Sequence, residues 1–305
     1  MDIDIVIPFV NGNDPQWIND YEKYKYGETT HLGDGNKNTR FDGYDILKYV
    51  FRTIDQYVPW VCKIHLLLHS ESQIPYWLNR DKVHIVLHKD FIPEKHLPIF
   101  NSSAFEMYLW NIPDLSEYFL YMNDDIIFNS KVKPELYFNE NKKPRIGIVK
   151  NKINNAELLN AAYLTTFMNS AKLASYGTDV NPFNYGYIYT TVHSINPYTK
   201  SILKHIYDMY TRQIENSITK FREEKNFNQY LYALYYCFRQ INGEYIRKMK
   251  YMKVDNNIGN IEKFLKDKTI HEICVNDVPI TQEMNKIELQ NIFENYFPDK
   301  SKYEL

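Results

Sequence analysis

Two adjacent carboxylates, Asp124 and Asp125, follow an apolar run at residues 118–122. This run predicts a buried strand, and ligands of open α/β sheets bind at the carboxyl ends of strands. Paired carboxylates at such a place offer the oxygen ligands that Mg²⁺ prefers and leave room for substrate phosphates. Asn and Asp also favour ordinary turns, so the pair alone leaves a metal site and a simple strand-end turn both open.

Polar turns follow two other predicted strands. The run from Asn11 to Asp14 comes after the β-branched stretch at residues 3–10, and Asn276 with Asp277 comes after residues 270–275. Each run alone is typical of a turn. If the three strands belong to one sheet, their polar ends converge on one edge, and we expect that convergence here.

Two further side chains are candidates for chemistry. His193 lies shortly before Pro197 and has an ordinary pKa near neutrality, which suits a general base, although most lone histidines are structural. Arg222 follows Lys220 and Phe221, and its planar guanidinium suits phosphate oxygens. A surface salt bridge with the acidic residues that follow is the alternative interpretation.

The elements that must position these residues alternate in the first half of the chain. Strands are predicted at residues 63–68, 83–87 and 145–149, and helices open at Asp42 and at a capping box formed by Ser103 and Glu106. The polar stretch up to residue 38 reads as a loop. Helical periodicity then covers residues 156–174, 198–210, 227–241 and 282–296. We therefore predict an α/β fold: a Rossmann-like, mainly parallel sheet flanked by helices, with a more helical second half packed against it.

Composition excludes several classes of protein. The formal net charge of -2 gives no basic field for nucleic acid, and the three cysteines form no CxxC pair, which argues against a zinc site or a disulfide framework. P-loop, dinucleotide, nucleophile-elbow and zincin motifs are absent from the sequence. The acidic start and the lack of a long apolar run lead us to expect a cytoplasmic chain with at most peripheral contact to the inner face of the membrane.

Four segments carry a more specific signal. They are FVNGNDPQW at residues 9–17, a long segment from Arg40 to Asp125, His193 with NPY at 196–198 and KFR at 220–222, and ICVND at 273–277. In this order they resemble the signatures of the Stealth family. That family includes bacterial capsular polysaccharide phosphotransferases and the catalytic subunit of the lysosomal-enzyme N-acetylglucosamine-1-phosphotransferase.

The resemblance implies an enzyme that transfers a hexose- or N-acetylhexosamine-1-phosphate from a UDP-sugar to a glycan hydroxyl, with UMP leaving. It implies Mg²⁺ or Mn²⁺ on Asp124, Asp125 and Asp277, a proton acceptor at His193, and phosphate charge held by Arg222. Asp14 and Asp277 would act beside the reaction centre. The implied substrate-binding residues are Asn11, Gly12, Asn13, Arg40, Asn101, Ser102 and Asn123.

The resemblance also implies a single catalytic domain over residues 1–305. Residues 1–150 would bind the nucleotide sugar, residues 151–265 would be mainly helical, and residues 266–305 would add a returning strand and a C-terminal helix. The partners would be a UDP-sugar and a glycan acceptor, free or lipid-linked. Two alternatives stay open: a metal-dependent glycosyltransferase that releases UDP, and a non-catalytic glycan-binding component of a capsule assembly complex.

Overall fold

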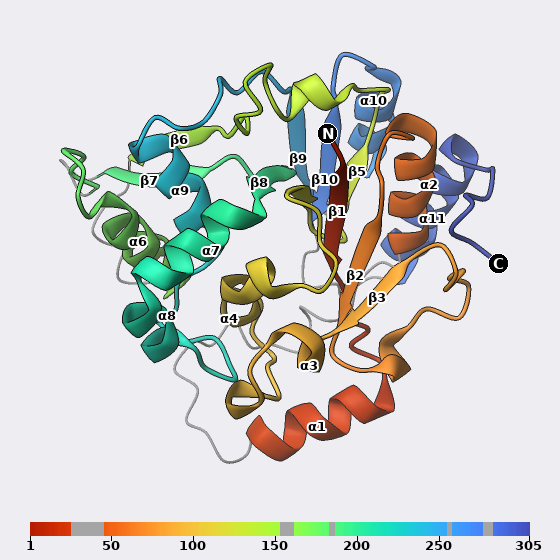
Figure 1. Ribbon diagram of the computed structural model, residues 1–305. Helices are drawn as coiled ribbons and strands as arrows, with labels where there is room; N and C mark the ends of the chain where they lie inside the picture. Colours follow the sequence, from red (N-terminus) through yellow and green to blue (C-terminus); the bar gives the residue numbers. More distant parts are fainter. Residues whose placement is uncertain (26–45, 153–161, 183–186, 255–257, 277–282) are drawn as a thin grey trace.

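A five-stranded sheet forms the centre of the molecule (Figure 1). The computed structural model describes residues 1–25, 46–152, 162–182, 187–254, 258–276 and 283–305. The strands are β1 (Ile3–Pro8), β2 (Ile64–Leu68), β3 (His84–Leu87), β4 (Tyr118–Tyr121) and β8 (Asn196–Thr199), in the order β3-β2-β1-β4-β8. The first four run parallel, and β8 pairs antiparallel with β4. The predicted mainly parallel sheet is confirmed.

Two apolar cores lie on opposite faces of this sheet. Ile5 and Ile7 of β1 belong to one core, whereas Val6 belongs to the other. Successive side chains of a strand point to opposite faces, so a strand that is covered on both sides must be apolar nearly throughout. Asp4 is the one polar residue of β1, and it is buried with its Oδ2 3.0 Å from Nε2 of His65 on β2.

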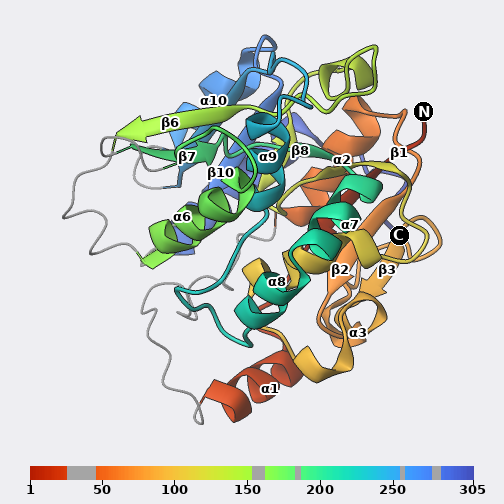
Figure 2. The ribbon, with the colours of Figure 1, turned by 60° about the vertical axis from the view of Figure 1, so that its left-hand side comes forward.

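Helices cover both faces, as the two views of the ribbon show (Figures 1 and 2). One core includes α2 (Leu47–Tyr57), α10 (Gly259–Lys266) and α11 (Glu283–Tyr296). The other includes α3 (His88–Phe91), α4 (Ser102–Phe105), α6 (Ala162–Ser175), α7 (Lys200–Met209), α8 (Thr211–Ser217) and α9 (Tyr230–Phe238). In the part of the chain that the structure describes, none of the helices combines the length and the apolar character needed to cross a bilayer.

A second sheet joins distant parts of the chain. It contains β5 (Ile126–Phe128), β10 (Glu272–Asn276) and β9 (Met249–Lys253), and β10 lies between the other two. Two further strands, β6 (Ile148–Lys152) and β7 (Tyr187–Thr191), pair antiparallel. The expectation that all three polar strand ends share one sheet is therefore wrong, because β10 belongs to this second sheet. The predicted strand at residues 270–275 does exist, as β10.

Two local predictions are also wrong. The predicted loop after the first turn begins with a helix, α1 (Pro15–Lys25), because Trp17 and Tyr21 pack against Phe100 and Phe221. The predicted capping box at Ser103 is replaced by a cap from Asn101, whose side chain accepts a hydrogen bond from the Ser103 amide. The predicted helix start at Asp42 lies outside the described residues.

Candidate active site

The Asp124–Asp125 pair lies where the chain passes from the first sheet to the second. Residues 122–125 connect β4 to β5, and the amide of Met122 still donates to the carbonyl of Val6 on β1 at 3.1 Å. The amide of Ile126 donates to the Asn123 carbonyl at 3.3 Å, which closes the turn. The predicted position of the pair, at the carboxyl end of a central parallel strand, is confirmed.

Strand β10 brings two donors to Asp125. Antiparallel pairing sets Cys274 opposite Ile126, and the Val275 amide donates to the Asp125 carbonyl at 2.8 Å. The thiol of Cys274 donates to Oδ2 of Asp125 at 3.5 Å, and Nδ2 of Asn276 donates to the same oxygen at 3.3 Å. Because β5 and β10 pair antiparallel, the beginning of β5 lies beside the end of β10. The polar residues that follow β4 and those at the end of β10 therefore lie close together.

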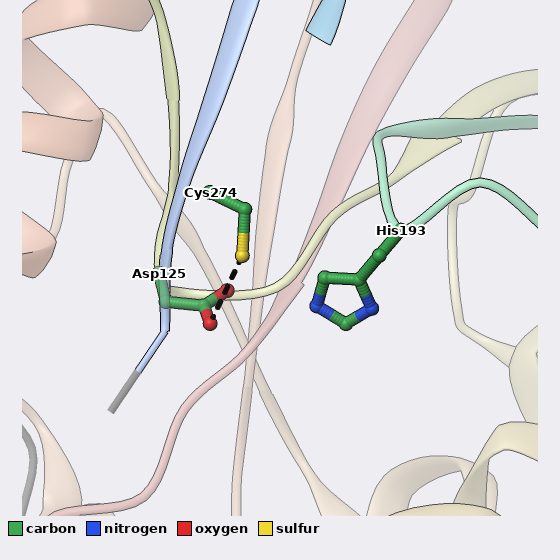
Figure 3. A group of neighbouring side chains, drawn as sticks. All are labelled: Asp125, His193 and Cys274. Atoms are coloured by element: carbon green, nitrogen blue, oxygen red, sulfur yellow. Dashed lines mark hydrogen bonds between the residues drawn. The ribbon is translucent and has the colours of Figure 1, made fainter. Parts of the chain in front are cut away.

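His193 reaches the same place from the loop between β7 and β8. Ligand atoms of Asp125, His193 and Cys274 all lie within 4.8 Å of one another (Figure 3). Nδ1 of His193 lies 3.4 Å from the hydroxyl oxygen of Tyr230 on α9, and the ring of Tyr251 on β9 meets the imidazole edge-on at a centroid distance of 5.4 Å. The structure therefore joins two of the predicted site residues and surrounds the histidine with two tyrosines.

Two polar atoms at this site are buried and make no hydrogen bond to the described residues. Among the described residues, neither Oδ1 of Asp125 nor Nε2 of His193 has a hydrogen-bond partner. Burial raises the pKa of Asp125, while the nearby His193 and the hydrogen bonds from Asn276 and Cys274 offset only part of that effect. A carboxylate in this condition gains from a nearby cation.

The donor set fits a hard divalent cation such as Mg²⁺ or Mn²⁺. Oδ1 of Asp125 is available, and Asp124, which is partly exposed, adds a second carboxylate in the same turn. The Cys274 thiol lies 3.5 Å from Oδ2 of Asp125, and a hard cation prefers carboxylate oxygens to sulfur. Asp277 and Arg40, which the sequence also predicts at the site, lie outside the described residues.

Arg222 belongs to a second polar group close to the end of β4. Its Nη2 donates to Oγ of Ser102 at 2.8 Å, so these two predicted residues are brought together. Next to them, Glu106 accepts hydrogen bonds from the Tyr121 hydroxyl at 3.0 Å and from the Gln229 amide at 2.9 Å. Burial raises the pKa of Glu106 to about 7, and these hydrogen bonds and the charge of Arg222 partly offset that rise. Tyr121 is the last residue of β4, so this group connects Arg222 to the strand that carries the Asp pair.

Asn101 has a structural role in what the structure describes. Besides capping α4, its Nδ2 donates to Oδ1 of Asn226 at 2.9 Å and to the carbonyl of Phe221 at 3.2 Å. It is buried, and it fixes the segment that carries Arg222. Contact between Asn101 and a substrate stays a prediction, as it does for Asn123.

The run from Asn11 to Asp14 forms the predicted turn after β1. The Asn13 amide donates to Oδ1 of Asn11 at 3.0 Å, which leaves Gly12 at the bend. Asp14 is buried at the beginning of α1. Its Oδ2 accepts from Gln73 at 2.8 Å and from Ser72 at 2.7 Å.

The two carboxylate oxygens of Asp14 also cap α1, because they accept the amides of Gln16 and Trp17. Burial opposes ionisation of Asp14, but these hydrogen bonds outweigh burial and hold its pKa below the ordinary value. The contacts of Asp14 are thus those of a structural carboxylate. Its predicted place beside the reaction centre stays a prediction.

Sequence reasoning missed four residues of the site: Cys274, Tyr230, Tyr251 and Glu106. Cys274 stands within an apolar strand, and Tyr230 belongs to a largely buried helix, so both patterns indicate core. The spacing of Ser103 and Glu106 predicts a helix cap, but the Glu106 carboxylate bonds instead to Tyr121 and Gln229. Cys274 and Glu106 lie within segments that resemble the family signatures, and this was their signal in the sequence.

Comparison with solved structures finds a chain to which this one is similar. It is the galactosyltransferase LgtC, in complex with donor and acceptor sugar analogs, with a TM-score of 0.44 and 12% sequence identity over 97% of this chain and 96% of that chain.

Comparison with sequences is more specific. Residues 40–146 match the family model described as Stealth protein CR2, conserved region 2. The chain is 30% identical to the capsular polysaccharide phosphotransferase WcwK of Streptococcus pneumoniae, over 99% of this chain and 98% of that protein. It is 29% identical to the exopolysaccharide phosphotransferase cps2G of Lactiplantibacillus plantarum, over 99% and 96%. With these relatives matched along almost their entire lengths, the chain is a transferase and belongs to the Stealth family of polysaccharide phosphotransferases.

Proposed function

We propose that this chain transfers a sugar 1-phosphate from a UDP-sugar to a hydroxyl group of a glycan acceptor, free or lipid-linked, and releases UMP. The product would be a phosphodiester of a capsular or other surface polysaccharide. Support for the reaction class comes from the relatives, which are named as polysaccharide phosphotransferases. Two observations carry the assignment of the site. Ligand atoms of Asp125 and His193 lie within 4.8 Å of each other, and among the described residues Oδ1 of Asp125 and Nε2 of His193 are buried without a hydrogen-bond partner.

In the proposed reaction the acceptor oxygen attacks the β-phosphorus of the donor. The bond between that phosphorus and the bridging oxygen breaks, and UMP leaves with the bridging oxygen. The bond between the anomeric carbon and its oxygen stays intact, so the anomeric configuration is kept. Nε2 of His193 takes the proton of the acceptor hydroxyl.

This role requires one particular tautomer of His193. Nε2 accepts a proton only if Nδ1 carries the hydrogen of the neutral imidazole, and the Tyr230 hydroxyl oxygen at 3.4 Å is the acceptor for that hydrogen. A divalent cation held by Asp125 and Asp124, with Asp277 as a further predicted ligand, would neutralise charge on the diphosphate. Arg222 holds phosphate charge as it builds up in the transition state.

The donor would lie between the turn at residues 11–14 and the group around Arg222. Asn11, Gly12 and Asn13 form that turn, and Ser102 bonds to Arg222. Asp14 stabilises the turn through its bonds to Ser72 and Gln73, and a place beside the reaction centre remains part of the proposal. Arg40 and Asn101 complete the proposed donor site.

The decisive experiment uses a UDP-hexose labelled at the β-phosphorus, incubated with the protein, Mg²⁺ and a glycan acceptor. Sugar-phosphate transfer moves the label to the acceptor and releases unlabelled UMP, and a chelator of divalent cations abolishes both. If the label stays in released UDP, the chain is a glycosyltransferase. If the donor binds but neither nucleotide forms with any acceptor of a broad glycan panel, the chain is a binding component.

A further inference from the structure

A buried ion pair lies at the beginning of β10, the strand that contacts Asp125. Nε of Arg247 lies 3.0 Å from Oε1 of Glu272, and both side chains are 0% exposed. Glu272 is the first residue of β10, and Arg247 precedes β9 by two residues. The pair therefore lies at the beginning of the strand whose other end contacts Asp125.

The pair holds both polar backbone groups of Ile195. Oε2 of Glu272 accepts from the Ile195 amide at 3.1 Å, and Nη2 of Arg247 donates to the Ile195 carbonyl at 2.8 Å. Ile195 is fully buried and comes two residues after His193. The loop that carries His193 is thus attached at a single residue, to β10 through Glu272 and to the segment before β9 through Arg247.

Other contacts fix the pair itself. Nη1 of Arg247 donates to the Arg145 carbonyl at 2.9 Å, and the Tyr137 hydroxyl donates to Oε1 of Glu272 at 2.9 Å. The guanidinium also lies over the rings of Tyr137 and Tyr245, at 4.8 and 4.7 Å from their centroids. A guanidinium with this many partners has one orientation, because its donors form a rigid planar fork.

The position of the pair on β10 links it to the reacting groups. Side chains two residues apart on a strand point to the same face, so Glu272 and Cys274 share one face of β10. Cys274 donates to Asp125 from that face, and Glu272 holds Ile195 from it. One strand therefore contacts Asp125 directly and holds His193 through Ile195, which sets the distance between the two proposed reacting residues.

Stability alone does not account for such a pair. Replacing a buried ion pair by apolar residues is often neutral or stabilising, because the desolvation of two charges offsets most of their attraction. The charged pair instead fixes the position of the loop that carries His193. We propose that Arg247 and Glu272 are positioning residues for the transfer reaction, which hold His193 at working distance from Asp125. This inference rests on the proposed function.

A matched control exists elsewhere in the molecule. Arg52 of α2 and Glu304 form a second buried pair, with Nε to Oε1 at 2.9 Å, Nη2 to Oε2 at 3.0 Å and exposures of 6% and 5%. It ties α2 to the C-terminal segment. Removing this pair tests the cost of losing a buried Arg–Glu pair without disturbing the His193 loop.

The experiment compares Arg247→Met/Glu272→Leu with Arg52→Met/Glu304→Leu, both made in the full chain. We expect comparable changes in melting temperature. Only the first variant should lose kcat, by roughly 10- to 100-fold, with the KM for the donor nearly unchanged. Amide hydrogen exchange at Ile195 should become faster in the first variant and not in the second.

A milder variant keeps the test decisive if the double variant does not fold. Arg247→Lys retains the charge but cannot reach both carbonyls and Glu272 at once, so kcat should fall about 10-fold. A folded variant with unchanged kcat and unchanged exchange at Ile195 would overturn the inference. A wild-type protein that transfers no sugar phosphate would instead overturn the proposed function. Hydrogen exchange would then still show whether Arg247 and Glu272 stabilise the backbone at Ile195.

Discussion

Asp14 and Asp125 lie at equivalent places in the sheet, but they differ in hydrogen bonding and their pKa values are shifted in opposite directions. Each follows a neighbouring parallel strand, β1 or β4, at its carboxyl end. Asp14 accepts hydrogen bonds on both oxygens, and its pKa is lowered. Asp125 accepts on Oδ2 alone among the described contacts, its Oδ1 is buried without a partner there, and its pKa is raised.

Hydrogen bonding and burial distinguish a structural carboxylate from a reactive one. A carboxylate whose lone pairs are all used stabilises the fold, and its removal should lower stability. A buried carboxylate with an unused oxygen costs stability and keeps a ligand position available, and a bound ion or a catalytic role can account for it. The two residues should therefore respond in opposite ways to the same kinds of substitution.

The largest effect is expected for Asp125→Asn. The amide keeps the shape of the side chain but removes the charge that would hold a cation, so kcat/KM should fall about 1000-fold, or about 4 kcal/mol. The melting temperature should stay equal or rise, because a buried charge with an unused oxygen is lost. Steady-state kinetics and calorimetry check both parts. A large loss of stability would mean that Asp125 is structural after all.

The next effect is expected for His193→Gln. Loss of the proton acceptor should lower kcat roughly 100-fold or more, because general-base catalysis contributes at least that much. His96→Gln is the matched control, since His96 is also partly buried and its Nε2 lies 3.0 Å from Glu215, away from the site. Equal kcat in both variants would remove His193 from the chemistry.

A smaller effect is expected for Tyr230→Phe. The ring stays, but Nδ1 of His193 loses its hydrogen-bond partner at 3.4 Å, so the productive tautomer is no longer favoured and kcat should fall about 10-fold. Tyr236→Phe on the same helix is the control. Its hydroxyl lies 2.7 Å from Oγ1 of Thr199, and its loss should affect stability without lowering kcat.

The smallest effect is expected at Asp14. Asp14→Ala should lower the free energy of unfolding by about 1 kcal/mol through loss of the helix cap, whereas Asp14→Asn should keep most of it because Asn caps helices equally well. Since the pKa of Asp14 is lowered in the folded state, its contribution is present above the ordinary value of 3.8 and is lost as pH falls below it. Urea unfolding at several pH values measures this.

The same two variants test whether Asp14 is only structural. If Asp14→Asn abolishes turnover while the protein stays stable, Asp14 acts on the reaction, as the family resemblance implies. Turnover close to that of the wild type would leave it as a cap for α1 and a support for the turn at residues 11–14.

Local patterns were sufficient for a large part of the fold and of the site. Apolar runs at residues 3–10 and 118–122 predicted β1 and β4, and the polar residues after them predicted the turns where Asp14 and Asp125 lie. Helical periodicity predicted most of α6, α9 and α11. These predictions succeed because the period of the side chains and the chemistry of turns are properties of a short segment.

The burial and hydrogen bonding of each functional group depend on contacts between segments that are distant in the sequence. Whether β10 joins β4 or β5 depends on long-range pairing, which a short sequence pattern does not specify, and the helix at α1 depends on packing against Phe100 and Phe221. Local sequence patterns identify the carboxylates that stand at strand ends, and the motifs identify the family. That both oxygens of Asp14 accept hydrogen bonds whereas Oδ1 of Asp125 does not depends on the tertiary fold. The neighbours that set hydrogen bonding and burial, Gln73, Cys274 and His193, are far away along the chain.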